Sequence, residues 1–240
     1  MTALRLSLVV SRVLAMTAAT LPLAVAAAGP VASNDAARQA GMTDVATLAP
    51  DIVMEMRYAG AENFTGAPVP GYEARVCYLK DDAARALARV QQAFAVRGYR
   101  LQVFDCYRPV RAVQSFVRWA HAPADPVARQ QYFPKIDKPD LLNGYISATS
   151  GHSRGYTVDL GVLDCRSGQC ALLEMGTPFD FFDPSANTDA PGLDAQVYAN
   201  RQLLLQAMAA EGFANYPMEW WHYTFPSGAE AVESYDFPVR

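Results

Sequence analysis

Histidine is scarce in this chain, with only three histidines in 240 residues. Basic residues are also few: 20 lysines and arginines face 24 acidic residues, and the formal net charge is −4. Without a basic surplus, the chain is a poor candidate for binding nucleic acid or an anionic membrane surface. No segment repeats at a fixed period, which argues against a solenoid or a propeller.

Cysteine pairs of the Cys-x-x-Cys type are absent, which disfavours a structural zinc site. The four cysteines are Cys77, Cys106, Cys165 and Cys170. In an exported protein they predict disulfides, and the short loop from Cys165 to Cys170 would bring these two sulfurs together. That pairing leaves Cys77 for Cys106, although the sequence alone allows other pairings.

Long hydrophobic runs are confined to the N-terminus. Arg5 and Arg12 begin a segment in which an apolar run, 13–28, ends in three alanines. This order predicts a secretory signal peptide at residues 1–28, cleaved after Ala28, and a periplasmic or secreted protein without stable membrane insertion. A membrane anchor is the alternative, but the uncharged run is short for a span. Cleavage would remove two arginines and no acid, so the net charge would become −6.

The remaining chain is long enough for one packed domain, since about half of all residues (51%) are apolar. We expect a loosely held lead-in at residues 29–50 and a single domain at 51–240. Helical and strand-like segments are interspersed without strict alternation, which predicts an α+β fold rather than a doubly wound sheet. Expected strands are 51–58, 74–79, 99–105, 154–163 and 213–225, expected helices are 81–97, 109–120 and 195–211, and 121–149 is expected to be an irregular loop.

Two of the three histidines lie near acidic residues in segments rich in glycine or aromatic residues. His152 precedes Asp159 in Ser-Gly-His-Ser-Arg-Gly-Tyr-Thr-Val-Asp, and Glu219 precedes His222 in Glu-Trp-Trp-His. A single histidine is more often an ordinary hydrogen-bonded residue, but this coincidence favours a metal site. Two imidazoles and one carboxylate would leave one position of a catalytic zinc ion free for water. His121 has no such setting, and we expect it on the surface.

The first of these segments can also be interpreted as a serine hydrolase triad of Ser150, His152 and Asp159. The Gly-x-Ser-x-Gly turn that presents the serine in many such enzymes is missing. The triad would also leave Glu219 and His222 without a role. We therefore set it aside.

Four motifs together resemble the D-alanyl-D-alanine dipeptidases of the VanX type, zinc enzymes of the wider D,D-peptidase and Hedgehog-like fold group. The motifs are Ser150-x-His152-x-x-Gly155-x-x-x-Asp159, Glu219-x-x-His222, Asp105-x-Tyr107-Arg108-Pro109 and Met175-Gly-Thr-Pro-Phe-Asp180. The resemblance extends from about Asp51 to Phe225. One departure is Thr157, where the motif more often has alanine or a similar small residue. The resemblance implies a single domain with an antiparallel-rich sheet and flanking helices.

The resemblance also implies roles for individual residues. His152, Asp159 and His222 would bind one zinc ion per chain. Glu219 would serve as general base and acid, and its aromatic neighbours argue against an exposed surface acid. Arg108 would stabilise the oxyanion; otherwise it would be an arginine at a helix start, paired with an exposed acid.

The substrate implied is a small dipeptide, D-alanyl-D-alanine, which presents an ammonium and a carboxylate close together. Asp180 could bind the ammonium, and Ser150 could donate to the carboxylate. Each of these two residues could equally be a turn or capping residue.

We expect this activity to serve the recycling of cell-wall peptides. An alternative with the same chemistry is a D,D-carboxypeptidase or endopeptidase acting on longer peptidoglycan peptides. The choice depends on whether loops 61–72 and 121–149 cover the cleft. A second alternative, a non-catalytic zinc-stabilised binding module, is disfavoured because it has no use for Glu219 and Arg108. An exported structural protein would leave the histidines and acids unexplained, and the sequence does not indicate an oligomeric state.

Overall fold

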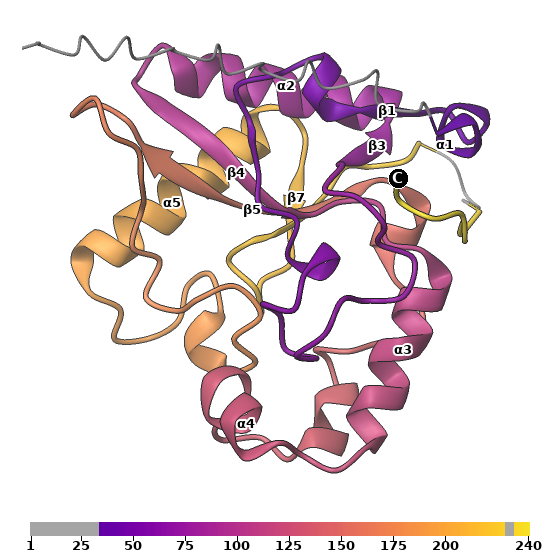
Figure 1. Ribbon diagram of the computed structural model, residues 1–240. Helices are drawn as coiled ribbons and strands as arrows, with labels where there is room; N and C mark the ends of the chain where they lie inside the picture. Colours follow the sequence, from indigo (N-terminus) through magenta and orange to yellow (C-terminus); the bar gives the residue numbers. More distant parts are fainter. Residues whose placement is uncertain (1–33, 229–232) are drawn as a thin grey trace, which may run out of the picture. The chain divides into compact units, whose positions relative to one another are not determined.

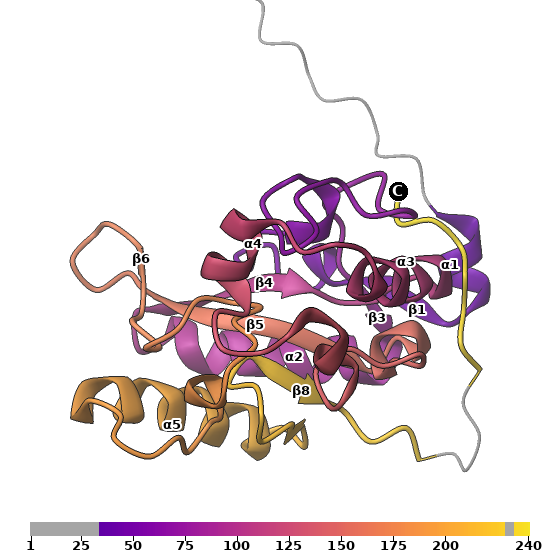
Figure 2. The same cartoon turned by 90° about the horizontal axis from the view of Figure 1, so that it is seen from below.

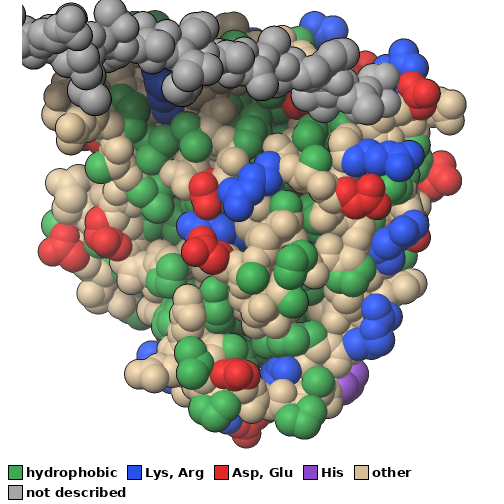
Figure 3. Space-filling model, viewed as in Figure 1, with side chains coloured by type: hydrophobic (Ala, Val, Ile, Leu, Met, Phe, Trp, Pro, Cys, Tyr) green, Lys and Arg blue, Asp and Glu red, His purple; other side chains and the backbone are tan. Residues whose placement is uncertain are grey.

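The computed structural model describes residues 34–228 and 233–240 (Figure 1). The predicted signal peptide, residues 1–28, lies outside these residues. A search of the described helices finds none with the length and apolar character of a membrane span. On the face seen in Figure 3, acidic and basic side chains lie next to one another at the centre and at the upper right.

A mixed sheet lies at the centre, with strands in the order β2-β4-β5-β8-β7 and with β6 also paired to β5. The bounds are Val53–Met54 for β2, Tyr99–Asp105 for β4, Thr157–Asp164 for β5, Ala171–Leu172 for β6, Ala214–Asn215 for β7 and His222–Thr224 for β8. β2 runs parallel to β4, and the other neighbouring strands are antiparallel. A second, two-stranded sheet pairs β1 (Met42–Asp44) with β3 (Tyr78–Lys80).

Helices lie on both sides of the central sheet. α2 (Asp81–Ala95) and α5 (Ala195–Ala210) share one apolar cluster with the buried side chains of β4 and β5. α3 (Val110–His121) and α4 (Pro126–Tyr132) lie on the opposite side of β4 and β5 from α2 (Figures 1 and 2). The arrangement is α+β, as the sequence predicted.

Local sequence explains the main helices. In α2 the apolar side chains of Leu87, Val90 and Phe94 recur at helical spacing and are buried. Gly98, shortly after the helix end, has φ +77°, a conformation that glycine adopts without strain. In α5 the Asp194 carboxylate accepts a hydrogen bond from the amide of Gln196 and so caps the first turn.

The expectation of a loose lead-in was wrong for residues 34–50. This segment contains α1 (Asp35–Gln39), β1 and a 3₁₀ turn. Ala37, Met42 and Val45 are buried against other parts of the chain. These apolar residues are spaced among polar ones without a clear period, so their burial depends on distant partners.

The irregular loop expected at 121–149 was also wrong in part, because it contains α4 and a 3₁₀ turn at Lys138–Leu142. The Asp125 carboxylate accepts hydrogen bonds from two amides of the first turn of α4, with Pro126 at its start. The strand expected at 51–58 is reduced to β2. Ile52 and Tyr58 are buried, but the chain turns away after Met56.

Both disulfides form in the pairing that the loop length favoured. Cys77 bonds to Cys106 and joins the start of β3 to the end of β4. Cys165 bonds to Cys170 and closes the loop between β5 and β6. The first bridge is fully buried, whereas the second lies at the surface.

Candidate active site

Three neighbouring strands bring three polar side chains into one row. The register pairs Asp159 of β5 with Asp105 of β4 on one side and with His222 of β8 on the other. Directly paired residues project to the same face of a sheet, so these side chains lie together. Asp159 is central in this row and is buried at 2% exposure.

His152 reaches the same place from a 3₁₀ turn that precedes β5. The Ser150 hydroxyl oxygen accepts a hydrogen bond from the His152 amide (3.2 Å) and caps this turn. The ring atom Nδ1 lies 2.7 Å from the carbonyl oxygen of Cys106. Because a carbonyl only accepts, Nδ1 carries a hydrogen, and in the neutral ring Nε2 is then the nitrogen with the lone pair. Nε2 lies 3.3 Å from Oδ2 of Asp159.

His152, Asp159 and His222 are candidate ligands for a cation. Each offers one ligand atom, and these atoms lie within 4.8 Å of one another. His152 Nε2 and Asp159 Oδ1 are buried and make no well-oriented hydrogen bond, although Nδ1 of His222 lies close to Oδ1. Such burial is costly unless another group satisfies these atoms. A cation between them would do so, and two imidazoles with a carboxylate suit zinc.

The charge state of Asp159 also suits a residue that binds a metal ion. Burial by itself favours the neutral acid, but the adjacent imidazoles of His152 and His222 hold the pKa of Asp159 well below its usual range. The Nδ1 atom of His222 lies 3.0 Å from Oδ1 of Asp159. Asp159 therefore presents an ionised carboxylate to the site.

Glu219 and His222 are held by a tight turn before β8. The His222 amide donates to the Glu219 carbonyl (3.3 Å), and the Glu219 amide donates to the Tyr216 carbonyl (2.9 Å). The side-chain amide of Asn215 donates to the carbonyl oxygens of both Glu219 and His222, each at 3.0 Å. Asn215 thus fixes both ends of the Glu-Trp-Trp-His segment.

The Glu219 carboxylate is buried beside the ligand set, with Oε2 3.5 Å from Nδ1 of His222. Burial disfavours its ionised form and raises the pKa of Glu219 to about 7, although the nearby His222 opposes the shift. A carboxylate that titrates near neutrality can both accept and return a proton.

Arg108 projects toward the same centre. Its Nε and Nη2 donate to Oδ2 of Asp105 at 2.9 and 2.8 Å, and Nη2 lies 3.6 Å from Oδ2 of Asp159. The guanidinium also lies over the rings of Tyr58 and Phe116, 5.2 and 5.1 Å from their centroids. These contacts fix a cationic donor beside the candidate metal ligands, not at an exposed helix start.

Asp180 closes another side of the site. Its carboxylate accepts from the Tyr58 hydroxyl at 3.0 Å, and its φ of +61° is unusual for a residue other than glycine. Burial, reinforced by the charge of Asp159, raises the pKa of Asp180 well above its ordinary value. Such a group is stabilised in its ionised form when a cation binds next to it.

The polar side chains at the centre of this site line one cavity of about 240 Å³, smaller than the roughly 300–1,000 Å³ common for drug-sized ligands. Its polar lining includes Arg108, Ser150, His152, Asp159, Asp180, Glu219 and His222. Phe64, from loop 61–72, and residues 144–147 and Thr149, from the segment expected to be a loop, also line it.

Comparison with known proteins places this site in a family. Residues 38–240 match the peptidase M15 family described as D-Ala-D-Ala dipeptidase. The chain belongs to the peptidase M15 family. Similar proteins include the D-alanyl-D-alanine dipeptidase of Enterococcus faecium, 34% identical over 83% of this chain and 98% of the relative. The Streptomyces coelicolor protein of the same name is 39% identical over 80% of this chain and 95% of its own length. That of Escherichia coli is 32% identical over 78% and 86%.

In this M15 peptidase, the sequence analysis had singled out the charged residues and histidines that line the cavity, but it missed Tyr145, Ser147, Thr149 and Tyr216 of the lining and the residues that support the site. Asn215 and the aromatic side chains of Tyr58, Phe64 and Phe116 had no motif that pointed to them. Asp105 belonged to a recognised motif, but its contact with Arg108 became apparent only in the structure. His121 is exposed, as expected.

Proposed function

We propose that this chain is a zinc-dependent dipeptidase that hydrolyses D-alanyl-D-alanine. The observation that carries the proposal is the convergence of His152, Asp159 and His222, with ligand atoms left unsatisfied, beside Glu219 and Arg108 in one small cavity. The names of the relatives support the choice of substrate.

His152, Asp159 and His222 would hold the zinc ion, which when bound polarises the attacking water and the scissile carbonyl. Glu219 accepts a proton from the attacking water and returns it to the amine that leaves. Arg108 donates to the oxygen that becomes negatively charged as the water attacks the carbonyl. Removal of such a donor typically costs about 3–4 kcal/mol in the transition state.

The ends of the substrate have matching groups in the cavity. We assign the substrate ammonium to Asp180, because a cation offsets the penalty of burying this carboxylate. We assign the substrate carboxylate to Ser150, which lines the cavity in addition to capping the turn of His152. These assignments extend the proposal to the orientation of the dipeptide.

The size of the cavity favours a dipeptide over a longer peptide. Phe64, residues 144–147 and Thr149 line the cavity, and Asp180 is only 4% exposed. An acylated amino group would remove the charge that Asp180 is proposed to bind, and the acyl chain would need additional space. This arrangement disfavours a D,D-carboxypeptidase or endopeptidase.

We further propose that the fold is of the D,D-peptidase and Hedgehog-like type and that the protein acts outside the cytoplasm in recycling of cell-wall peptides. Two disulfides support an oxidising compartment. Cell fractionation and N-terminal sequencing test the export, and a mature protein that begins at Gly29 is the expected result. A cytoplasmic protein that retains residues 1–28 would contradict it.

The activity is tested by elemental analysis of the purified protein together with hydrolysis of D-alanyl-D-alanine before and after chelation. We expect one zinc ion per chain, loss of activity with the chelator and recovery on adding zinc. The N-acetylated dipeptide, assayed in parallel, should be cleaved poorly. Undiminished activity in the metal-free protein would refute the proposal, and preference for the acylated peptide would favour a carboxypeptidase.

A further inference from the structure

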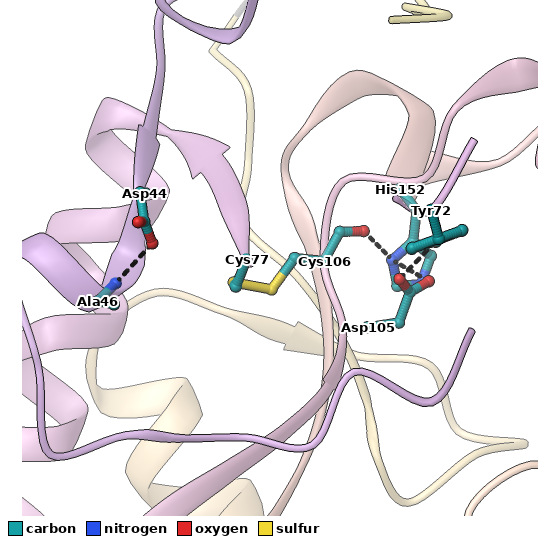
Figure 4. The surroundings of a disulfide bond; sticks show 7 residues. All are labelled: Asp44, Ala46, Tyr72, Cys77, Asp105, Cys106 and His152. Carbon is teal, nitrogen blue, oxygen red and sulfur yellow. Dashed lines mark hydrogen bonds and ion pairs between the residues drawn. A yellow bond between two sulfur atoms is a disulfide. The ribbon is translucent and has the colours of Figure 1, made fainter. Parts of the chain in front are cut away.

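The buried Cys77–Cys106 disulfide lies directly behind one of the metal-ligand candidates (Figure 4). The carbonyl oxygen of Cys106 accepts the hydrogen bond from Nδ1 of His152 at 2.7 Å. Both cysteines are completely buried. One residue, Cys106, therefore carries both a covalent bridge and the acceptor that orients the His152 ring.

The position of this carbonyl depends on a segment that has just left the sheet. β4 ends at Asp105, so Cys106 has no partner strand of its own. The next two amides are anchored by single hydrogen bonds: Tyr107 donates to the Tyr78 carbonyl (3.0 Å), and Arg108 donates to the His152 carbonyl (3.3 Å). The disulfide adds a covalent tie at Cys106 itself.

The other end of the bridge is anchored as well. The Cys77 carbonyl accepts from the Val45 amide at 2.9 Å, and β3 begins at the next residue. The bridge thus connects the carbonyl behind His152 to an ordered part of the second sheet. A change at Cys77 would be transmitted to His152 through two bonds in series, the disulfide and the hydrogen bond.

We propose that Cys77 and Cys106 are positioning residues for the metal site. Their disulfide fixes the Cys106 carbonyl, which keeps the hydrogen on Nδ1 of His152 and directs Nε2 toward Asp159 and the cation. The inference depends on the metal site of the proposed function. Loss of a hydrogen-bond partner behind a metal-bound histidine typically costs about 10- to 100-fold in metal affinity. Breaking the bridge keeps the Cys106 carbonyl as a hydrogen-bond acceptor but removes its covalent restraint. We therefore expect zinc affinity to fall by about tenfold, near the lower end of this range.

The second disulfide supplies a matched control. Cys165 and Cys170 close a surface loop, and neither residue lines the site cavity. Replacing either pair removes one covalent cross-link and affects the stability of the fold. Of the two cysteine pairs, only Cys77 and Cys106 include a residue that contacts His152. A loss of zinc affinity that occurs only when this pair is replaced would therefore reflect positioning of His152 and not general stabilisation of the fold.

The first experiment measures the zinc dissociation constant of the metal-free protein by competition with a chromophoric chelator, well below each variant's unfolding temperature. The Cys77→Ala/Cys106→Ala variant should bind zinc about tenfold more weakly than the parent, and the Cys165→Ala/Cys170→Ala variant should stay within about twofold of it. Equal affinity in the first variant and the parent would overturn the inference. A parent that binds no zinc would instead refute the proposed function.

The second experiment includes a measurement on the parent that does not require any cysteine variant to fold. Only three histidines are present, so a ¹⁵N spectrum of the histidine rings in the intact, metal-free protein can be assigned with His121→Gln and His222→Gln variants. We expect neutral His152 to hold its hydrogen on Nδ1 in the parent and to exchange between both nitrogens when the bridge is removed. A parent in which Nε2 carries the hydrogen would contradict the inference.

Discussion

Replacing Glu219 by glutamine separates the chemical role of this residue from its effect on the fold. The substitution keeps the shape of the side chain but removes its ability to accept a proton. General acid–base catalysis typically contributes about 10²- to 10⁴-fold to the rate. We therefore expect kcat for D-alanyl-D-alanine to fall by about 10³-fold while the zinc content stays at that of the parent.

The same substitution should stabilise the metal-free protein at alkaline pH. Burial raises the pKa of Glu219 from 4.5 to about 7, and each pKa unit corresponds to about 1.36 kcal/mol. The folded state therefore binds the proton more tightly than the unfolded state does, and ionisation destabilises the fold. This penalty is absent below the unfolded pKa, grows between about pH 4.5 and 7, and reaches its full size above pH 7. Glutamine avoids it, so the variant should gain up to about 3 kcal/mol at pH 8.

The measurement is urea unfolding of both metal-free proteins at pH 4.5 and pH 8, together with kcat of the zinc-loaded forms. Glu73→Gln, a change at an exposed glutamate, is the control and should alter neither quantity. If the Glu219→Gln variant kept more than a tenth of the parent kcat, the assignment of Glu219 as the general base would be wrong. A variant less stable than the parent at pH 8 would show that the buried carboxylate is not destabilising.

Three further substitutions test the surrounding residues. Arg108→Lys should lower kcat by about 10²- to 10³-fold without loss of zinc, because an ammonium cannot reproduce the forked donors of a guanidinium; an unchanged kcat would exclude an oxyanion role. Asp180→Asn should raise KM for the free dipeptide at least about tenfold with a smaller change in kcat, since one charge pair is lost; an unchanged KM in steady-state kinetics on the dipeptide would show that Asp180 does not bind the ammonium. Asn215→Ala removes two hydrogen bonds to the carbonyls of Glu219 and His222, so both kcat and zinc affinity should fall by about tenfold, and parent-like values of both would argue against this support.

The parts of the fold that could be predicted are those with a strong local signal. α2 and α5 combine helical spacing of apolar residues with a following glycine, and β4 is a continuous strand between two turns. The site could be predicted because histidine is rare enough for two occurrences near acids to stand out. α4 was missed even though Asp125 and Pro126 form a recognisable start, because the helix is only seven residues long and lies among prolines.

The supports of the site were beyond prediction for a different reason. Tyr72 donates to the Asp105 carboxylate at 2.6 Å across a separation of 33 residues. Asp105 in turn holds Arg108, so a tyrosine in an early loop helps to position the oxyanion donor. No local pattern marks such a contact, because it is produced by tertiary packing. Apolar residues in 34–50 were misjudged for the same reason.

The sheet register connects the departure at Thr157 to the metal site. Thr157 is paired with Thr224 across β5 and β8, two positions along each strand from the pair of Asp159 and His222. The two threonine hydroxyls lie 3.0 Å apart and satisfy each other in a position where a lone buried hydroxyl would be unfavourable. Because a shift of one residue would turn the side chains of a strand to the opposite face, this hydrogen bond favours the alignment that places His222 beside Asp159. The larger residue at Thr157 is therefore compatible with the ligand set, since Thr224 provides its partner.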